Sequence, residues 1–320
     1  MFSLETVKEK LDDIQSIAGD NKVEIISVSG KEEEKKATVT IAIADIKDNN
    51  TKLMIEGRAT YKLKMAGAKS VSVNFVELEE GGKVAEETIL TAANRPYFIA
   101  IASGKGGVGK STVTANLAKA MDKLGKKVAV IDADIYGPSI PGILGVASKP
   151  QQVGDKFEPA TTVDGIKVMS MEYFQDPTKP VIWRGPMLGR MLDVFFNQTI
   201  WGEIDVVLLD LPPGTGDIAL DVNNMVKDCK EIIVTTPHEA ATHIAKRAGQ
   251  MGRQLNQEIL GVIENMAYLE LPSGEKHYIF GQGGGETLAS ELETSVIGVI
   301  PMGEYPEIYE EIAIGIIEKM

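Results

Sequence analysis

The stretch Gly104-Lys105-Gly106-Gly107-Val108-Gly109-Lys110-Ser111-Thr112 decides the fold. It follows the apolar run Phe98 to Ala102 and precedes a segment with helical spacing, Thr112 to Leu124. The pattern G-x-x-x-x-G-K-[ST] between a strand and a helix is that of a phosphate-binding loop. Its glycines let backbone amides turn toward phosphate oxygens, which a Cβ would obstruct. The helix presents its positive end to the same anion. The stretch therefore predicts a nucleotide site.

Two side chains of this loop have roles that the pattern assigns. Lys110 is expected to reach the β- and γ-phosphates, and the Ser111 hydroxyl is expected to bind Mg²⁺. The backbone from Gly104 to Thr112 is expected to surround the phosphates.

Short apolar runs continue along the chain after the loop. A strand buried on both faces, as in a parallel sheet covered by helices, has this nearly uniform composition. We therefore predict an α/β fold with a doubly wound parallel sheet. The further runs are Val128–Ile131, Val206–Leu209, Glu231–Val234 and Leu260–Ile263.

Carboxylates follow two of these runs. Asp132 and Asp134 follow the second strand, and Asp210 ends the run at 206–209. Ligands of a doubly wound sheet bind beyond the carboxyl ends of its strands, so these side chains are expected to face the nucleotide. Asp210 is expected to bind Mg²⁺ directly or through another group, and Asp132 is a further metal candidate. Either Asp134 or Asp132 could position the attacking water; the alternative for Asp132 and Asp210 is that they cap the next element.

Composition sets limits on the function. The chain has 320 residues, a formal net charge of −13 and one cysteine, Cys229. This length suggests about two domains. A single cysteine excludes an intrachain disulfide or a zinc site built from several cysteines. The acidic balance argues against broad, non-specific capture of nucleic acid.

Residues 1–79 are predicted to form a small α/β domain. Leu4, Val7, Leu11 and Ile14 have helical spacing, and a second helix is expected from Lys52 to Met65. Strands are expected at 23–28, 37–44 and 71–76. Residues 80–96 are interpreted as a linker and 97–320 as the nucleotide-binding domain, which carries 19 basic and 29 acidic side chains when counted from residue 97.

No signal peptide or membrane span is expected, so the predicted location is the cytoplasm. The segment from Glu307 to Met320 has isoleucines on one face, but its polar face is acidic. Because membrane-surface helices usually have a basic polar face, we expect this segment to pack on its own domain.

The loop contains an additional lysine, Lys105, which indicates a more specific resemblance than the general phosphate-loop pattern does. Lys-Gly-Gly-Val-Gly-Lys-Ser is similar to the deviant Walker A ATPases related to MinD and ParA. The resemblance implies ATP as the nucleotide and a homodimer in which Lys105 reaches the partner's nucleotide. It also implies slow, switch-like ATP hydrolysis that involves Lys105, Lys110, Asp134 and Asp210.

Motifs beyond the loop resemble the Mrp/ApbC family of ATPases. That family consists of cytosolic iron–sulphur cluster carriers, and its members often begin with a small domain also found in iron–sulphur assembly factors. The resemblance implies that Asn265 recognises adenine; a strand-end cap is the alternative. The motifs are those at 132–139, 183–187, 210–217, 264–266 and 280–285.

The chain departs from this family at one place. Members have Cys-Pro-x-Cys shortly after the Asn-Met pair, whereas Leu271 and Gly274 stand there in this chain. Fe–S clusters are held mainly by thiolates, so the usual cluster site is absent. Cys229 precedes a buried run and is interpreted as a core residue.

Because it lacks these cysteines, the chain resembles the SalA-like members of the family. This resemblance implies a regulator that binds DNA or a partner protein in an ATP-dependent way. Lys246, Arg247 and Arg253 could form a local basic patch for DNA. The alternative for these three residues is a solvated helix face. The partners left open are therefore DNA, a regulatory protein or an iron–sulphur client protein.

Overall fold

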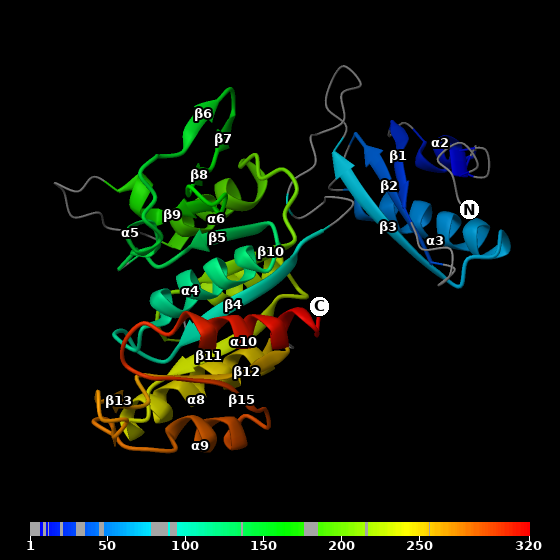
Figure 1. Cartoon of the computed structure of the whole chain (residues 1–320). Helices are drawn as coiled ribbons and strands as arrows, with labels where there is room; N and C mark the ends of the chain where they lie inside the picture. Colours follow the sequence, from blue (N-terminus) through cyan, green and yellow to red (C-terminus); the bar gives the residue numbers. More distant parts are fainter. Residues whose placement is uncertain are drawn as a thin grey trace. The chain divides into compact units, whose positions relative to one another are not determined.

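A computed structural model describes most of the chain in two compact units, Met1–Arg95 and Pro96–Met320 (Figure 1). Each unit has its own sheet. The residues that the structure describes are 7–8, 11, 13–19, 22–29, 36–44, 48–77, 89, 95–135, 137–175, 185–214, 217–255 and 257–320.

The first unit is a three-stranded sheet with helices packed on it. The strands have the order β1-β2-β3; β1 and β2 are antiparallel, whereas β2 and β3 are parallel and are joined through α3. The elements are α2 (Ile14–Ala18), β1 (Val23–Ser29), β2 (Lys36–Ile43), α3 (Asn49–Met65) and β3 (Ser70–Glu77).

Apolar residues that have helical spacing in the first unit are buried in the structure. Val7, Leu11 and Ile14 are buried in its core, whereas Leu4 lies outside the described residues. Helix α3 begins at Asn49, before the expected Lys52, because the Asp48 carboxylate caps it by accepting a hydrogen bond from the Thr51 amide at 3.1 Å.

The second unit contains an eight-stranded sheet of order β15-β12-β11-β4-β10-β5-β9-β8. All paired neighbours are parallel except β8 and β9. The predicted α/β fold with a doubly wound parallel sheet is therefore confirmed. The strands of this sheet are β4 (Tyr97–Ser103), β5 (Val128–Asp132), β8 (Ala160–Thr161), β9 (Lys167–Ser170), β10 (Val206–Asp210), β11 (Lys230–Thr235), β12 (Ile259–Asn265) and β15 (Val296–Ile300).

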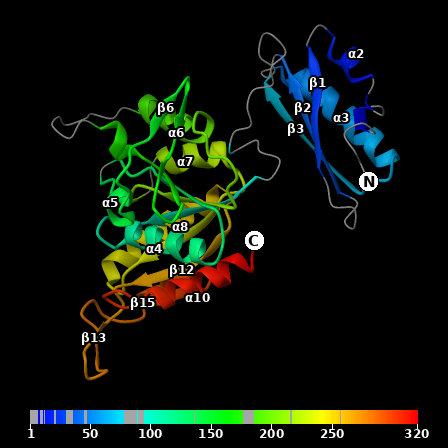
Figure 2. The ribbon, with the colours of Figure 1, turned by 45° about the horizontal axis from the view of Figure 1, so that its top comes forward.

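Helices cover both faces of this sheet (Figures 1 and 2). Alternate residues of β4 point to opposite faces: Ile99 and Ile101 pack with α4, α5 and α10, whereas Ala102 faces α8. The helices are α4 (Lys110–Lys123), α5 (Ile140–Leu144), η1 (Met171–Phe174), α6 (Gly185–Asn197), α7 (Asp217–Met225), α8 (Glu239–Gln254), α9 (Gly284–Glu291) and α10 (Pro306–Ile317).

Two small hairpins lie outside the main sheet. One is formed by β6 (Gln151–Val153) and β7 (Lys156–Glu158), and the other by β13 (Leu269–Glu270) and β14 (Lys276–His277).

Helix α10 packs on its own unit, as expected. It lies against α4 and β15, its Ile312 and Ile316 are buried, and Lys123 of α4 forms an ion pair with Glu310. Within the described ranges, no helix is long and apolar enough to cross a membrane.

Candidate functional site

The loop between β4 and α4 is shaped by glycines that other parts of the chain approach closely. A Cβ on Gly104 would lie 2.3 Å from the Ala245 amide nitrogen of α8. Gly109 has a left-handed backbone with φ 84°, and a Cβ there would lie 2.2 Å from Nδ2 of Asn265. Any other residue at these two positions would push the loop away from its neighbours. The glycine pattern is therefore needed for the packing of the loop as well as for access to its amides.

Lys110 and Asp210 form the centre of the site. Lys110 Nζ lies 2.6 Å from Asp210 Oδ2, and both residues are buried. The Ser111 hydroxyl donates to the same carboxylate oxygen at 2.6 Å, and the Thr114 hydroxyl donates to Oδ1 at 2.7 Å. The register of β10 beside β4 and β5 brings Asp210 to this point from a distant part of the sequence. The structure thus joins three predicted residues, Lys110, Ser111 and Asp210, that come from two separate motifs.

Asp134 completes the charged cluster. Its Oδ2 lies 3.6 Å from Lys110 Nζ, and its Oδ1 accepts a hydrogen bond from the Gly137 amide at 3.2 Å. Two carboxylates therefore share the ammonium of Lys110 in this structure. Such a cluster of carboxylates and a hydroxyl offers the hard oxygen ligands that Mg²⁺ prefers.

Asp132 has a different environment from Asp134. Its Oδ2 accepts hydrogen bonds from the Ser170 hydroxyl at 2.9 Å and from the amides of Ser139 and Ile140 at 3.2 Å each. Burial, followed by the negative charge of Asp210, raises the pKa of Asp132 to about 7. Its contacts therefore tie it to the segment after β5.

A cleft of about 390 Å³ opens beside this cluster. It is lined by loop residues together with Asp134 and the start of α5. Lys105 also lines it, and among the described residues its ammonium has no hydrogen-bond or ion-pair partner. Within the described part of the chain, Lys105 is thus an unpaired cation at the edge of this cleft.

Asn265 lies at the loop, at the end of β12. Its Nδ2 donates to the Val108 carbonyl at 2.9 Å, and its side chain is buried. The next residue, Met266, has a left-handed backbone with φ 55°. Motif analysis did not identify Met266 or Thr114 as contributors to the site. A polar residue one helical turn after Lys110 could have indicated Thr114, but no sequence signal indicates the backbone of Met266.

Several residues of the motifs fall outside the described ranges. These are Tyr136, Trp183, Arg184, Thr215 and Gly216.

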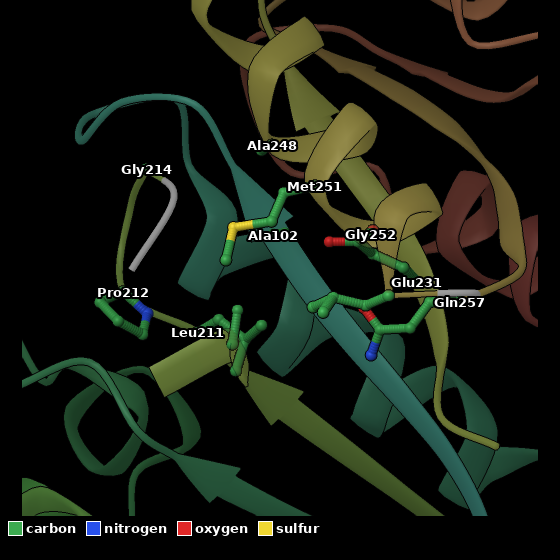
Figure 3. Close-up of a pocket in the computed structure, with 11 residues that line it drawn as sticks. Ala102, Leu211, Pro212, Gly214, Glu231, Ala248, Met251, Gly252 and Gln257 are labelled. Atoms are coloured by element: carbon green, nitrogen blue, oxygen red, sulfur yellow. The ribbon is translucent and has the colours of Figure 1, made fainter. Parts of the chain in front are cut away.

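A small cavity lies between α8 and the segment that follows Asp210 (Figure 3). Leu211, Pro212 and Gly214 line one side, and Glu231 of β11 lines another with Gly252. Glu231 is buried, and its Oε2 has no hydrogen-bond partner among the described residues. Burial raises the pKa of this carboxyl to about 8. Sequence reasoning treated Glu231 only as the start of a strand.

In the part of the chain that the structure describes, few side chains that could ligate a cluster or a metal lie at the expected positions. Cys229 is buried, as expected for a core residue. Leu271 and Gly274 lie in the hairpin of β13 and β14, where the Gly274 amide donates to the Leu271 carbonyl. Among the described residues, no three histidine, cysteine or acidic side chains gather as a metal site would require.

The basic residues of α8 are largely neutralised by acids. Lys246 forms an ion pair with Glu291 at 3.0 Å, and Arg253 forms one with Glu293 at 3.0 Å. This arrangement favours the solvated helix face over a basic patch for DNA.

Comparison with known proteins also indicates a nucleotide-binding P-loop protein. The family model described as ParA, NUBPL iron-transfer P-loop NTPase, matches residues 95–316. The chain belongs to this family. Within it, the chain is a member of the Mrp/ApbC group, and as a P-loop NTPase it is an ATPase.

Individual relatives of the chain are consistent with this family assignment. The chain is similar to an iron-sulfur cluster carrier protein of Bacillus subtilis, with 46% identity over 88% of this chain and 84% of the relative. It is 47% identical to one of Mycobacterium tuberculosis over 65% of this chain, but this spans only 54% of that relative. A nucleotide-binding protein of Archaeoglobus fulgidus, solved in complex with ADP, is 38% identical with a TM-score of 0.55 and covers 70% of this chain and 88% of its own.

Proposed function

We propose that this Mrp/ApbC family member binds and slowly hydrolyses Mg-ATP at the loop from Gly104 to Thr112, and that it acts as a homodimeric switch. The observation that carries the proposal is the buried cluster of Lys110, Ser111 and Asp210 beside the cleft. The ADP complex of the Archaeoglobus relative supports a nucleotide at this fold.

The residues present fit Mg²⁺. Ser111 and Asp210 would hold the ion, because the Ser111 hydroxyl lines the cleft and is hydrogen-bonded to the Asp210 carboxylate, and both groups offer hard oxygen ligands. When bound, Mg²⁺ supplies positive charge that neutralises the phosphates. Lys110 leaves Asp210 for the β- and γ-phosphates, while the loop amides bind phosphate oxygens.

Two further charged groups have roles in hydrolysis. Asp134 orients the attacking water, because it lies beside Lys110 and lines the cleft. Lys105 stabilises transition-state charge on the nucleotide of the partner subunit, since its ammonium lines the cleft and is unpaired among the residues that the structure describes. Asp132, proposed from sequence as a metal ligand or water-positioning group, is assigned instead to holding the backbone at Ser139 and Ile140, whose amides donate to its carboxylate.

Asn265 keeps its proposed place near the base. Its Oδ1 and the second N–H of Nδ2 remain for a nucleotide, because one N–H is donated to the Val108 carbonyl. Its contact with the loop also matches the alternative of a structural cap.

The names of the relatives and the cysteine content of this chain point to different cargoes. The names of the relatives favour a carrier or assembly factor that handles an iron–sulphur cluster for a client protein. The single, buried Cys229 opposes this, because a cluster shared by two subunits through two cysteines each needs four accessible thiolates. We therefore favour a SalA-like switch whose ATP state controls binding to a partner protein. The acidic charge and the paired bases of α8 oppose DNA as the partner.

The test has two arms. ATP binding and hydrolysis are measured for the parent and for Lys110→Ala, and equal values would refute the nucleotide site. Anaerobic reconstitution with iron and sulphide, read by absorbance and by bound iron per dimer, then tests the cargo. Stoichiometric cluster binding would overturn the proposed loss of the cluster site, and ATP-dependent retardation of duplex DNA would overturn the preference for a protein partner.

A further inference from the structure

Met266 occupies a backbone conformation that its side chain disfavours. Its φ is 55°, in the left-handed region where a Cβ crowds the following carbonyl and where glycine or asparagine is usual. Such strain persists only where the surrounding structure imposes it, and it gathers at binding sites. The residue follows Asn265 directly at the end of β12.

The two flanking residues are both held by β15. Asn265 is the last residue of β12 paired with β15, opposite Ile300. The Ala267 amide donates to the carbonyl of the same Ile300 at 2.9 Å. Both neighbours of Met266 are therefore held by the same residue of β15, which fixes the ends of this short segment beside the sheet.

The turn places two side chains against the phosphate loop. Asn265 Nδ2 donates to the Val108 carbonyl at 2.9 Å. The Cε of Met266 lies 3.5 Å from the position that a Cβ of Gly109 would take, so the end of the methionine side chain lies in the space beside this glycine. Gly109 is itself left-handed and precedes Lys110 at the start of α4. Two left-handed residues, one in each segment, therefore face each other at the loop.

We infer that Met266 is a positioning residue for the nucleotide, which supports the loop at Gly109 and directs the Asn265 amide to Val108. The inference rests on the proposed function, because it assumes that ATP binds at this loop. Glycine or asparagine would relieve the strain, so the presence of methionine indicates that its side chain contributes something else. Met266 is partly exposed and is not a member of the buried core. Its flexible thioether chain can fill the irregular space beside a glycine.

Three substitutions separate the backbone from the side chain. Met266→Ala keeps the disfavoured backbone and removes the contact, Met266→Gly removes both, and Met266→Leu keeps most of the apolar contact. Calorimetry gives the Kd for Mg-ADP, steady-state kinetics give KM and kcat for ATP, and thermal unfolding gives Tm. The alanine and glycine variants are expected to raise Kd and KM about fivefold, equivalent to roughly 1 kcal/mol, with kcat within about twofold. The leucine variant is expected to stay close to the parent in Kd.

Glu293 offers a matched control. It is a second non-glycine residue with positive φ, at 45°, and it follows α9, which packs against α8, β12 and β15. Glu293→Gly relieves the same kind of backbone strain and is expected to leave Kd and KM unchanged.

The inference is overturned if Met266→Ala and Met266→Gly bind Mg-ADP like the parent, or if Met266→Leu is as weak as Met266→Ala. Failure of the proposed function looks different, because the parent itself would then neither bind Mg-ADP nor differ from Lys110→Ala. A variant that lowers Tm but leaves Kd and KM unchanged would also overturn it, since that result describes a merely structural residue.

Discussion

Lys110 and Asp210, one hundred positions apart in the sequence, form a buried ion pair with 2.6 Å between Nζ and Oδ2. Asp210 is fully buried and also accepts hydrogen bonds from Ser111 and Thr114. Its charge is therefore compensated inside the protein. A nucleotide must compete with this carboxylate for the lysine.

Replacing Lys110 is expected to weaken both binding and folding. Lys110→Ala removes a charge-assisted contact to phosphate, which should raise the Kd for Mg-ADP roughly a hundredfold, or about 3 kcal/mol. It also leaves Asp210 without its cation in a buried place, which should lower the free energy of unfolding by about 3 kcal/mol. Calorimetry and urea unfolding measure the two effects. An unchanged unfolding curve would contradict the ion pair.

Asp210→Asn is expected to separate stability from activity. The amide can still accept from Ser111 or Thr114, and Lys110 keeps the Asp134 carboxylate at 3.6 Å, so the loss of stability should be smaller than for Lys110→Ala. The loss of the negative oxygen beside Ser111 should lower kcat about a hundredfold, because charge at this point is required in the transition state. Steady-state hydrolysis with varied Mg²⁺ is the measurement. Parent-like kcat in this variant would remove Asp210 from the site.

Lys105→Ala tests the action of this residue in trans. Because Lys105 has no partner in its own subunit among the described residues, its removal should leave Tm and the Kd for Mg-ADP near the parent values. Hydrolysis should fall by about a hundredfold or more, as for a charge supplied across an interface. Mixing Lys105→Ala with Lys110→Ala gives a decisive comparison. Recovery of activity in the mixture supports action across subunits, and no recovery contradicts it.

Metal removal should weaken ATP binding more than it weakens folding. With EDTA, the carboxylates of Asp134 and Asp210 face the triphosphate without a neutralising ion. In Mg²⁺, ATP at about a hundred times its Kd should stabilise the protein by about 2.7 kcal/mol. Thermal unfolding with ATP, with and without EDTA, measures this difference. Equal stabilisation in both conditions would contradict a bound ion.

Glu231 should make stability depend on pH. Its pKa is raised from 4.5 to about 8 by burial, so between these values the folded state holds one more proton than the unfolded state. Its contribution is complete below about pH 4.5 and is lost as pH rises to about 8, at about 1.4 kcal/mol per pH unit. Glu231→Gln removes this dependence and should stabilise the protein at pH 8 relative to the parent, but not at pH 5.

Urea unfolding of both proteins at several pH values tests this prediction. Because Asp132 has a raised pKa of about 7 and adds a slope of the same sign, the difference between parent and variant is the informative quantity. A difference that does not change with pH would contradict a neutral, buried Glu231.

Much of the second unit could be predicted because its signals are local. The run Phe98–Ala102 and the glycine pattern after it describe a strand, a loop and a helix that are continuous in the sequence. The convergence of Asp210 and Asp134 also followed from a general rule, because the carboxyl ends of parallel strands lie at one edge.

The remaining features depend on long-range packing. Asp132 and Asp134 are similar in sequence, yet Ser170 and the backbone at 139–140 surround only Asp132. The left-handed backbone of Met266 lies where β12 ends beside β15, and the burial of Glu231 results from the approach of Gly252 in α8. No local pattern indicates which distant residue will contact these side chains.

The position of β4 within the sheet has a consequence for biosynthesis. This strand is the first of its unit to be made, but its neighbours in the sheet are β10 and β11, which are translated much later. The glycine loop therefore leaves the ribosome long before the strands that hold it have been synthesised. Until Val206–Asp210 has been synthesised, the apolar strand β4 lacks its neighbours in the sheet. A nascent chain stalled before that point is therefore expected to need chaperone protection.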